Sequence, residues 1–287
     1  MSKKSPDIKT LKKAILETLA YSAVFKYPLS FHQLGTYVGA EVNEYKKFVK
    51  ALRQLEKQKK ISQKYGKYHL FGKHTVKWDK KLKLTKKKVK EDVEILEVLQ
   101  KIPWIQMIAL TGPLAAANPD KKGDVDVFIV SKKRRLWLTR FFVFLYLKAL
   151  GKYRTDKNPA GKVCPNLLVT EDNLAWDSKR QNLYVASEIV RMQPILDKRD
   201  TYLRFLEANS WIKGFFPNFR WQTPEKKKNF NFGVLDVLEY FAFIGQKFYM
   251  SKKITSEQIS LKFIHFNRDD KTEAILEKFK NISTKIA

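Results

Sequence analysis

Two aspartates, Asp124 and Asp126, flank a single valine at the start of an apolar run that continues to residue 130. Residues i and i+2 of a β-strand project from the same face, so both carboxylates would enter one site. Two carboxylates suit Mg²⁺ or Mn²⁺, because these ions prefer oxygen ligands and Mg²⁺ commonly binds one or two acids plus substrate phosphates. The pair therefore predicts a divalent-metal site that stabilises charge during phosphoryl chemistry.

The residues before this pair supply the elements that would position it. Residues 104–110 form a compact apolar run of strand length, followed by Thr111, Gly112 and Pro113. A glycine lets the backbone approach a ligand closely, so Gly112 suits a turn that lies against bound phosphates.

A strand, a glycine-containing turn, a short helical crossover and two acids flanking one apolar residue resemble the polymerase-beta-like nucleotidyltransferase superfamily. The resemblance implies a mixed sheet with helices over residues 102–197, and catalytic, metal-binding roles for Asp124 and Asp126. It also implies metal-dependent transfer of a nucleoside monophosphate from a nucleoside triphosphate to an acceptor, with Thr111 and Gly112 binding the nucleotide. Residues 164–172 and 183–189 are similar to segments of a mostly uncharacterised prokaryotic group of such proteins, which brings no known substrate.

The chain departs from the family pattern at two positions. Pro113 stands where the family usually has Ser or Gly, which removes a backbone donor. The family's third carboxylate normally lies on a later strand, here predicted over residues 163–170, whose inward polar residue is Asn166. An amide can ligate a metal, so Asn166 is a predicted ligand, but it is a poor base. The alternative is a non-catalytic nucleic-acid-binding or regulatory protein with a degenerate nucleotidyltransferase domain.

Other charged residues near this segment leave two interpretations open. Arg134, Arg135 and Arg140 flank a helix expected after the Asp-Val-Asp strand, where they would either face phosphates or cap and solvate that helix. Glu188 would approach the site or, as is more common beside Ile189 on a helix, remain a surface acid.

The N-terminal part predicts three helices followed by a hairpin. Apolar residues recur every three or four positions over residues 7–27, and Ser30 with Gln33 has the form of a capping box for a second helix. Asn43 is the predicted N-cap of the third helix, and residues 61–71 form a glycine-centred hairpin. This order is typical of a winged helix-turn-helix, in which the third helix usually enters the major groove of DNA.

The third helix has an apolar and a basic face. Its predicted apolar face contains Tyr45, Phe48, Val49, Leu52 and Leu55. Its outward, nucleic-acid-binding face contains Lys46, Lys47, Lys50, Arg53 and Lys57. Only Gln54 and Gln58 are candidate amide readers of bases, so we expect recognition mainly through phosphates. Winged helices also dock proteins and basic faces are often merely solvated, so a protein partner is the alternative.

The net charge of +28 favours polyanionic partners, namely a nucleoside triphosphate and nucleic acid. Residues 1–100 carry 24 Lys or Arg against 10 Asp or Glu. Their net charge is therefore +14, half of the total for the chain. The nucleic-acid signal is therefore strongest there, although a basic surface can also serve solubility.

The whole pattern predicts an α+β protein with four segments. They are a winged-helix-like domain (residues 1–75), a Lys-rich helical connector (76–101), a nucleotidyltransferase-like domain (102–197) and a helical C-terminal region (198–287). The single cysteine, Cys164, excludes an intramolecular disulfide, and no histidine lies near it at the spacing of structural zinc ligands. Residues 136–150 are too short for a membrane span, which needs ~20 apolar residues. We therefore expect a cytoplasmic protein without a membrane partner.

Overall fold

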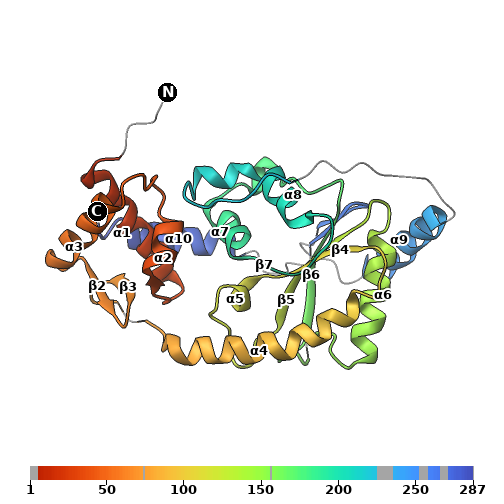
Figure 1. Cartoon of the computed structure of the whole chain (residues 1–287). Coiled ribbons are helices and arrows are strands. Elements are labelled where there is room, and N and C mark those ends of the chain that lie inside the picture. Colours follow the sequence, from red (N-terminus) through yellow and green to blue (C-terminus); the bar gives the residue numbers. More distant parts are fainter. Residues whose placement is uncertain are drawn as a thin grey trace.

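The computed structural model of the chain describes residues 6–73, 75–155, 157–224, 235–251, 258–265 and 271–286. Over these residues the protein is α+β, which confirms the predicted class. A small N-terminal unit lies at one end, and a larger sheet with helices on both faces forms the other (Figure 1).

The N-terminal unit contains three helices and a small antiparallel sheet of order β1-β3-β2. Its elements are α1 (Ile8–Val24), β1 (Leu29–Ser30), α2 (Phe31–Tyr37), α3 (Tyr45–Lys57), β2 (Ile61–Lys64) and β3 (Lys67–Leu70). One apolar core joins them, with Ile15, Leu34 and Leu55 among its fully buried side chains.

Local sequence signals account for most of the boundaries in this unit. The Ser30 hydroxyl accepts a hydrogen bond from the Gln33 backbone N–H at 3.1 Å, and the Gln33 side chain accepts one from the Ser30 N–H at 2.9 Å, so the predicted capping box is confirmed. Tyr65 and Gly66 both have positive φ, which suits the tight turn between β2 and β3. The predicted N-cap Asn43 is wrong, because α3 begins at Tyr45 and no side chain caps it.

A long helix, α4 (Trp78–Leu99), contains most of the Lys-rich connector and runs from the N-terminal unit along the larger sheet (Figure 1). Its C-terminal part buries Leu96 and Leu99 in the main core. Two of its lysines hold the loop before Asp124, since the Lys81 ammonium donates to the Pro119 carbonyl and the Lys88 ammonium to the Gly123 carbonyl, both at 2.8 Å.

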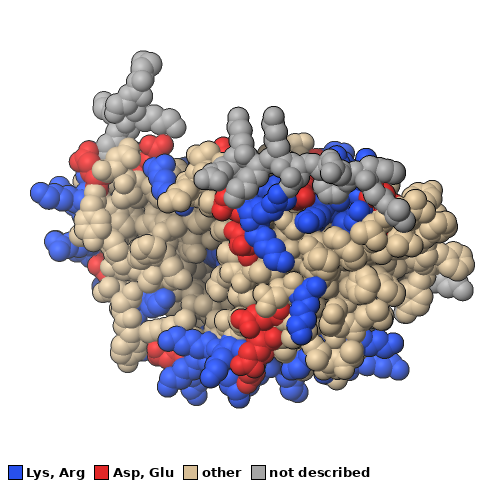
Figure 2. Space-filling view, turned by 45° about the vertical axis from the view of Figure 1, so that its right-hand side comes forward, with Lys and Arg blue, Asp and Glu red and all other residues tan. Residues whose placement is uncertain are grey.

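Other lysines within residues 77–90 of the connector remain exposed. They are Lys77, Lys80, Lys83, Lys86, Lys87 and Lys90. Figure 2 shows basic side chains gathered along the lower edge of the molecule, over α4. The connector is therefore both a positively charged surface and a support for the loop that leads to the acid pair.

The larger sheet is mixed, as predicted, with strand order β7-β4-β5-β6-β9-β8. Strands β5 and β6 are parallel, and the other neighbours are antiparallel. The strands are β4 (Ile105–Leu110), β5 (Val125–Ser131), β6 (Val163–Thr170), β7 (Gln193–Asp197), β8 (Gln258–Ile259) and β9 (Phe263–His265). The central strand β5 therefore follows Asp124 directly and contains Asp126.

Helices cover both faces of this sheet. The remaining helices are α5 (Gly112–Ala115), α6 (Leu136–Ala149), α7 (Leu183–Arg191), α8 (Thr201–Ala208), α9 (Leu235–Ser251) and α10 (Thr272–Ser283). Val127 and Ile129 of β5 pack in the core that contains α4 and α6, whereas Phe128 and Val130 pack in the core that contains α7 and α8. This alternation places Asp126 on the α7 side of the sheet.

No helix among the described residues is both long and apolar enough to cross a bilayer. The apolar run of residues 136–150 lies almost entirely in α6, which buries Trp137, Val143 and Leu147 against the sheet.

The C-terminal region differs from the purely helical prediction. Strands β8 and β9 extend the sheet, with His265 of β9 opposite Leu167 of β6. Helix α10 then packs on α1 of the N-terminal unit, where the rings of Phe279 and Tyr21 lie 5.7 Å apart (Figure 1). The C-terminal region therefore contacts both parts of the molecule.

Candidate metal and nucleotide site

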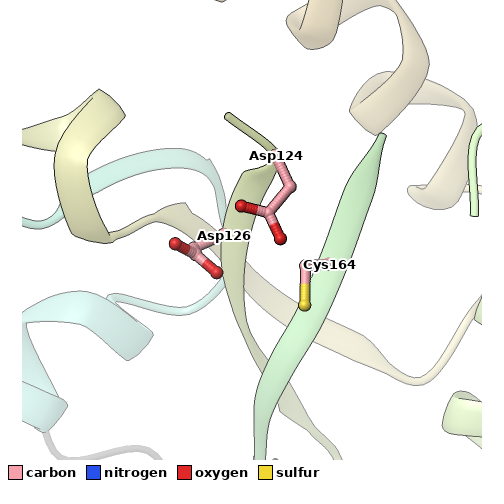
Figure 3. Close-up of side chains that lie close together, drawn as sticks. All are labelled: Asp124, Asp126 and Cys164. Carbon is pink, nitrogen blue, oxygen red and sulfur yellow. The ribbon is translucent and has the colours of Figure 1, made fainter. Parts of the chain in front are cut away.

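The two aspartates lie on one side of β5, as the i, i+2 spacing predicted. Figure 3 shows the carboxylates of Asp124 and Asp126 close together at the start of the strand. Both line a large cleft with a volume of about 2510 Å³. A nucleotide-sized ligand would therefore have access to the pair.

The turn after β4 brings the two predicted nucleotide-binding residues against this pair. The Thr111 N–H donates to the Asp126 carbonyl at 3.0 Å. Gly112 has a φ of +61°, and a Cβ there would lie 2.7 Å from the Asp126 Oδ2 atom. Glycine suits this position, because the backbone is left-handed and any side chain would require the Asp126 carboxylate to shift.

Asn166 of β6 also points into the site. The ladder between β5 and β6 shifts register between Val127 and Phe128, and the bulge contains Asn166. Bulges commonly re-aim side chains next to active sites. The Asn166 Nδ2 atom donates to the Asp126 Oδ1 atom at 2.9 Å, and the buried Asn166 Oδ1 atom has no hydrogen-bond partner.

Glu188 is a site residue, which corrects the preference for a surface position. Its Oε2 atom accepts a hydrogen bond from the Gly112 N–H at 3.2 Å, so α7 brings a third carboxylate to the turn. No local signal indicated this contact, because it depends on how α7 packs on the sheet.

Cys164 is a second site residue that the sequence did not single out. It lies opposite Asp126 in the β5–β6 ladder. Its sulfur and one carboxylate oxygen from each of Asp124 and Asp126 lie within 4.8 Å of one another (Figure 3). The i, i+2 rule, applied to Asn166 and Cys164, would have suggested it.

The electrostatics of the site are dominated by buried negative charge. Burial, together with the nearby charges of Asp124 and Glu188, raises the pKa of Asp126 to about 7, against the opposing effect of Arg154 and Lys271. Burial also raises the pKa of Glu188. A cation would relieve this cluster, since like charges in one site disfavour joint ionisation.

Comparison with protein-family models, with curated proteins and with solved structures found no match. The function is therefore inferred from the site itself and from the residues around it.

Other charged residues considered from the sequence lie in structural contacts. Arg134 and Arg135 both pair with Asp236 of α9, and the Arg140 guanidinium donates to Gln246 of the same helix. These arginines therefore connect α6 to α9. None of these contacts reaches the acid pair.

Replacing Asp126 with Asn should raise the free energy of unfolding of the metal-free protein, and by more at about pH 8 than at about pH 5. In the fold the carboxyl has a pKa of about 7, against an ordinary value of 3.8, so the stability of the parent falls as the pH rises through this window. Asparagine does not titrate and avoids this loss. Urea denaturation with a chelator, at several pH values, measures the difference.

Asp79→Asn is the matched control, because Asp79 is exposed on α4. Its stability difference from the parent should change little with pH. If the difference in free energy of unfolding between Asp126→Asn and the parent also changes little with pH, the pKa of Asp126 is not raised.

Proposed function

We propose that this protein is a metal-dependent nucleotidyltransferase that moves a nucleoside monophosphate from a nucleoside triphosphate to an acceptor. The observation that carries the proposal is the acid pair of Asp124 and Asp126 beside the Gly112 turn, where a side chain would strike Asp126. The order of elements around them supports the polymerase-beta-like resemblance. In particular, β4, α5 and β5 follow one another with the acids on the second strand.

The residues of the site fit Mg²⁺ or Mn²⁺. Asp124 and Asp126 would hold the ion, and the unpartnered Asn166 amide oxygen is a further oxygen donor once the amide is reversed. When bound, the ion would neutralise charge on the phosphates of the nucleotide. Its position between the carboxylates would also offset their mutual repulsion.

The rest of the site would bind and orient the triphosphate. Arg154 and Lys271 line the cleft on the side of the acids, where they would attract phosphate oxygens. Gly112 lets the chain approach those oxygens without a side chain in between. Glu188 supplies a carboxylate that Asn166 does not, and it holds the Gly112 turn through the backbone N–H.

Transfer of label tests this proposal. The purified full chain is incubated with each nucleoside triphosphate labelled at the α-phosphate, with Mg²⁺ or Mn²⁺, and with RNA, DNA or cellular protein. We expect label on one acceptor class, and only when a divalent ion is present. No transfer from any nucleotide to any acceptor, with bound nucleotide confirmed by calorimetry, would contradict the proposal.

A second candidate is a non-catalytic protein that binds a ligand in this cleft. Both acids already have partners from the chain, since Arg154 lies 3.2 Å from Asp124 and the Asn166 amide donates to Asp126. Pro113 also removes a donor from the turn. For this candidate the same assay gives nucleotide binding without transfer.

We further propose that the N-terminal unit is a winged helix that binds nucleic acid through phosphates. Its order α1-β1-α2-α3-β2-β3 supports this, as does the exposure of Lys46, Lys50, Arg53 and Lys57 on α3. Two details differ from the predicted helix faces. The Lys47 ammonium lies 2.6 Å from the Glu44 carboxylate, and Tyr45 is 63% exposed instead of buried.

Changing Lys46, Lys50 and Arg53 together to Gln should weaken binding of the full chain to duplex DNA or RNA. The dependence of log affinity on log salt should also become shallower, by about 0.9 for each phosphate of B-form DNA that the variant no longer neutralises. Binding should vary little with sequence, because few amide readers face outward. Fluorescence anisotropy at several salt concentrations measures both quantities.

The control triple variant changes Lys83, Lys86 and Lys90 of α4 to Gln, which removes the same charge from another exposed surface. It should bind more tightly than the α3 variant. Equal reductions of affinity in the two variants would mean that net charge, and not α3, determines binding.

A further inference from the structure

The candidate site contains a sulfur atom that the chemistry of Mg²⁺ does not use. Cys164 lies on β6, and its sulfur is within 4.8 Å of carboxylate oxygens from both Asp124 and Asp126. All three residues line the same cleft, so an ion has access to them together (Figure 3). Mg²⁺ prefers oxygen ligands, whereas thiolates favour softer ions such as Zn²⁺.

We infer that Asp124, Asp126 and Cys164 form a binding site for a divalent transition-metal ion of the Zn²⁺ class, with Cys164 as the sulfur ligand. This inference rests on the proposed metal-binding role of the acid pair, and it adds a ligand that selects among metals. Binding converts the thiol to a thiolate and releases its proton to solvent. Three protein ligands leave one position of a tetrahedral ion for water or substrate.

The geometry is close to what such an ion requires. With metal–oxygen distances of about 2.0–2.2 Å and a metal–sulfur distance of about 2.3 Å, ligand atoms of a tetrahedral site lie roughly 3.5 Å apart. The three ligand atoms lie within 4.8 Å of one another, so they need to approach by up to about 1.3 Å, which side-chain rotations can provide.

Some polar and charged groups around the three ligands favour a bound cation, and one opposes it. Glu188 adds negative charge and favours a cation. Arg154 opposes one, because its guanidinium lies 3.2 Å from the Asp124 carboxylate and must share it with the ion. Asn166 donates to Asp126 through its amide nitrogen, and reversal of that amide would place its unpartnered oxygen toward the ion.

Cobalt titration tests the inference, because Co²⁺ replaces Zn²⁺ and its bond to a thiolate absorbs in the near ultraviolet. The chain has a single cysteine, so any such band reports Cys164. We expect the metal-free full chain to develop the band and to saturate at one Co²⁺ per chain. Added Zn²⁺ should remove the band, whereas an equal concentration of Mg²⁺ should leave it unchanged.

Two variants locate the ion. Cys164→Ser should lose the band and keep the circular dichroism spectrum of the parent, because serine is nearly isosteric. Asp126→Asn should keep the thiol but show the band only at higher Co²⁺ concentration. Absence of the band in the parent, saturation at one Co²⁺ per two chains, or an unchanged titration of Asp126→Asn would each overturn the inference.

The cobalt result and the transfer result are independent. A cobalt–thiolate band in a protein that transfers no nucleotide would overturn the proposed transferase and leave this inference standing. Nucleotide transfer with Mg²⁺ and no cobalt–thiolate band would overturn the inference alone.

Discussion

Asp126→Asn should lower the rate of nucleotide transfer by roughly two to three orders of magnitude, since loss of a single charge-stabilising group in an enzyme costs about 10²–10³. Asp126 is the member of the acid pair whose pKa is raised by partial burial, and asparagine keeps its shape while removing its charge. The substitution should also weaken metal-assisted nucleotide binding in calorimetry. Because the same change is expected to stabilise the metal-free fold, loss of transfer would not reflect unfolding.

Asp79→Asn, on the exposed side of α4, removes the same charge outside the cleft and should transfer nucleotide at the rate of the parent. If Asp126→Asn binds metal and nucleotide as tightly as the parent, Asp126 is not a metal ligand.

Gly112→Ala should abolish transfer and also destabilise the protein. The left-handed backbone costs an alanine about 1–2 kcal/mol, and its Cβ would lie 2.7 Å from the Asp126 carboxylate oxygen. Either the turn or Asp126 must move, and both belong to the site. Transfer assays and thermal unfolding measure the two effects.

Gly72→Ala is the control that separates the cost of a left-handed backbone from the effect of the Asp126 contact. Gly72 has a φ of +68°, and a Cβ there meets nothing within 4 Å. This control should lose about the same backbone stability and keep full transfer. Equal transfer by the two alanine variants would show that the Gly112 turn does not contact the reacting groups.

Sequence patterns predicted the parts of this protein that depend on neighbouring residues. The capping box at Ser30, the hairpin turn at Gly66 and the two strands around Gly112 are local, and each lies where the pattern indicated. The proximity of Asp124 and Asp126 could also be predicted from the sequence, because positions i and i+2 of one strand share a face.

The features that the sequence did not predict depend mainly on contacts between distant segments. Glu188 reaches Gly112 only because α7 packs on the sheet, and Cys164 reaches Asp126 only because β5 and β6 pair in this register. Strands β8 and β9 are too short for a periodic pattern to show. Asn43 does not cap α3, because the helix begins at Tyr45 and Glu44 occupies the N-cap position.

The contact between α10 and α1 has a consequence for the order in which the protein folds during its synthesis. Helix α1 leaves the ribosome early, but its partner α10 follows about 250 residues later. Domains generally fold as they emerge, so the N-terminal unit would first fold with the surface around Tyr21 uncovered. That surface would stay exposed until α10 is synthesised and packs on α1.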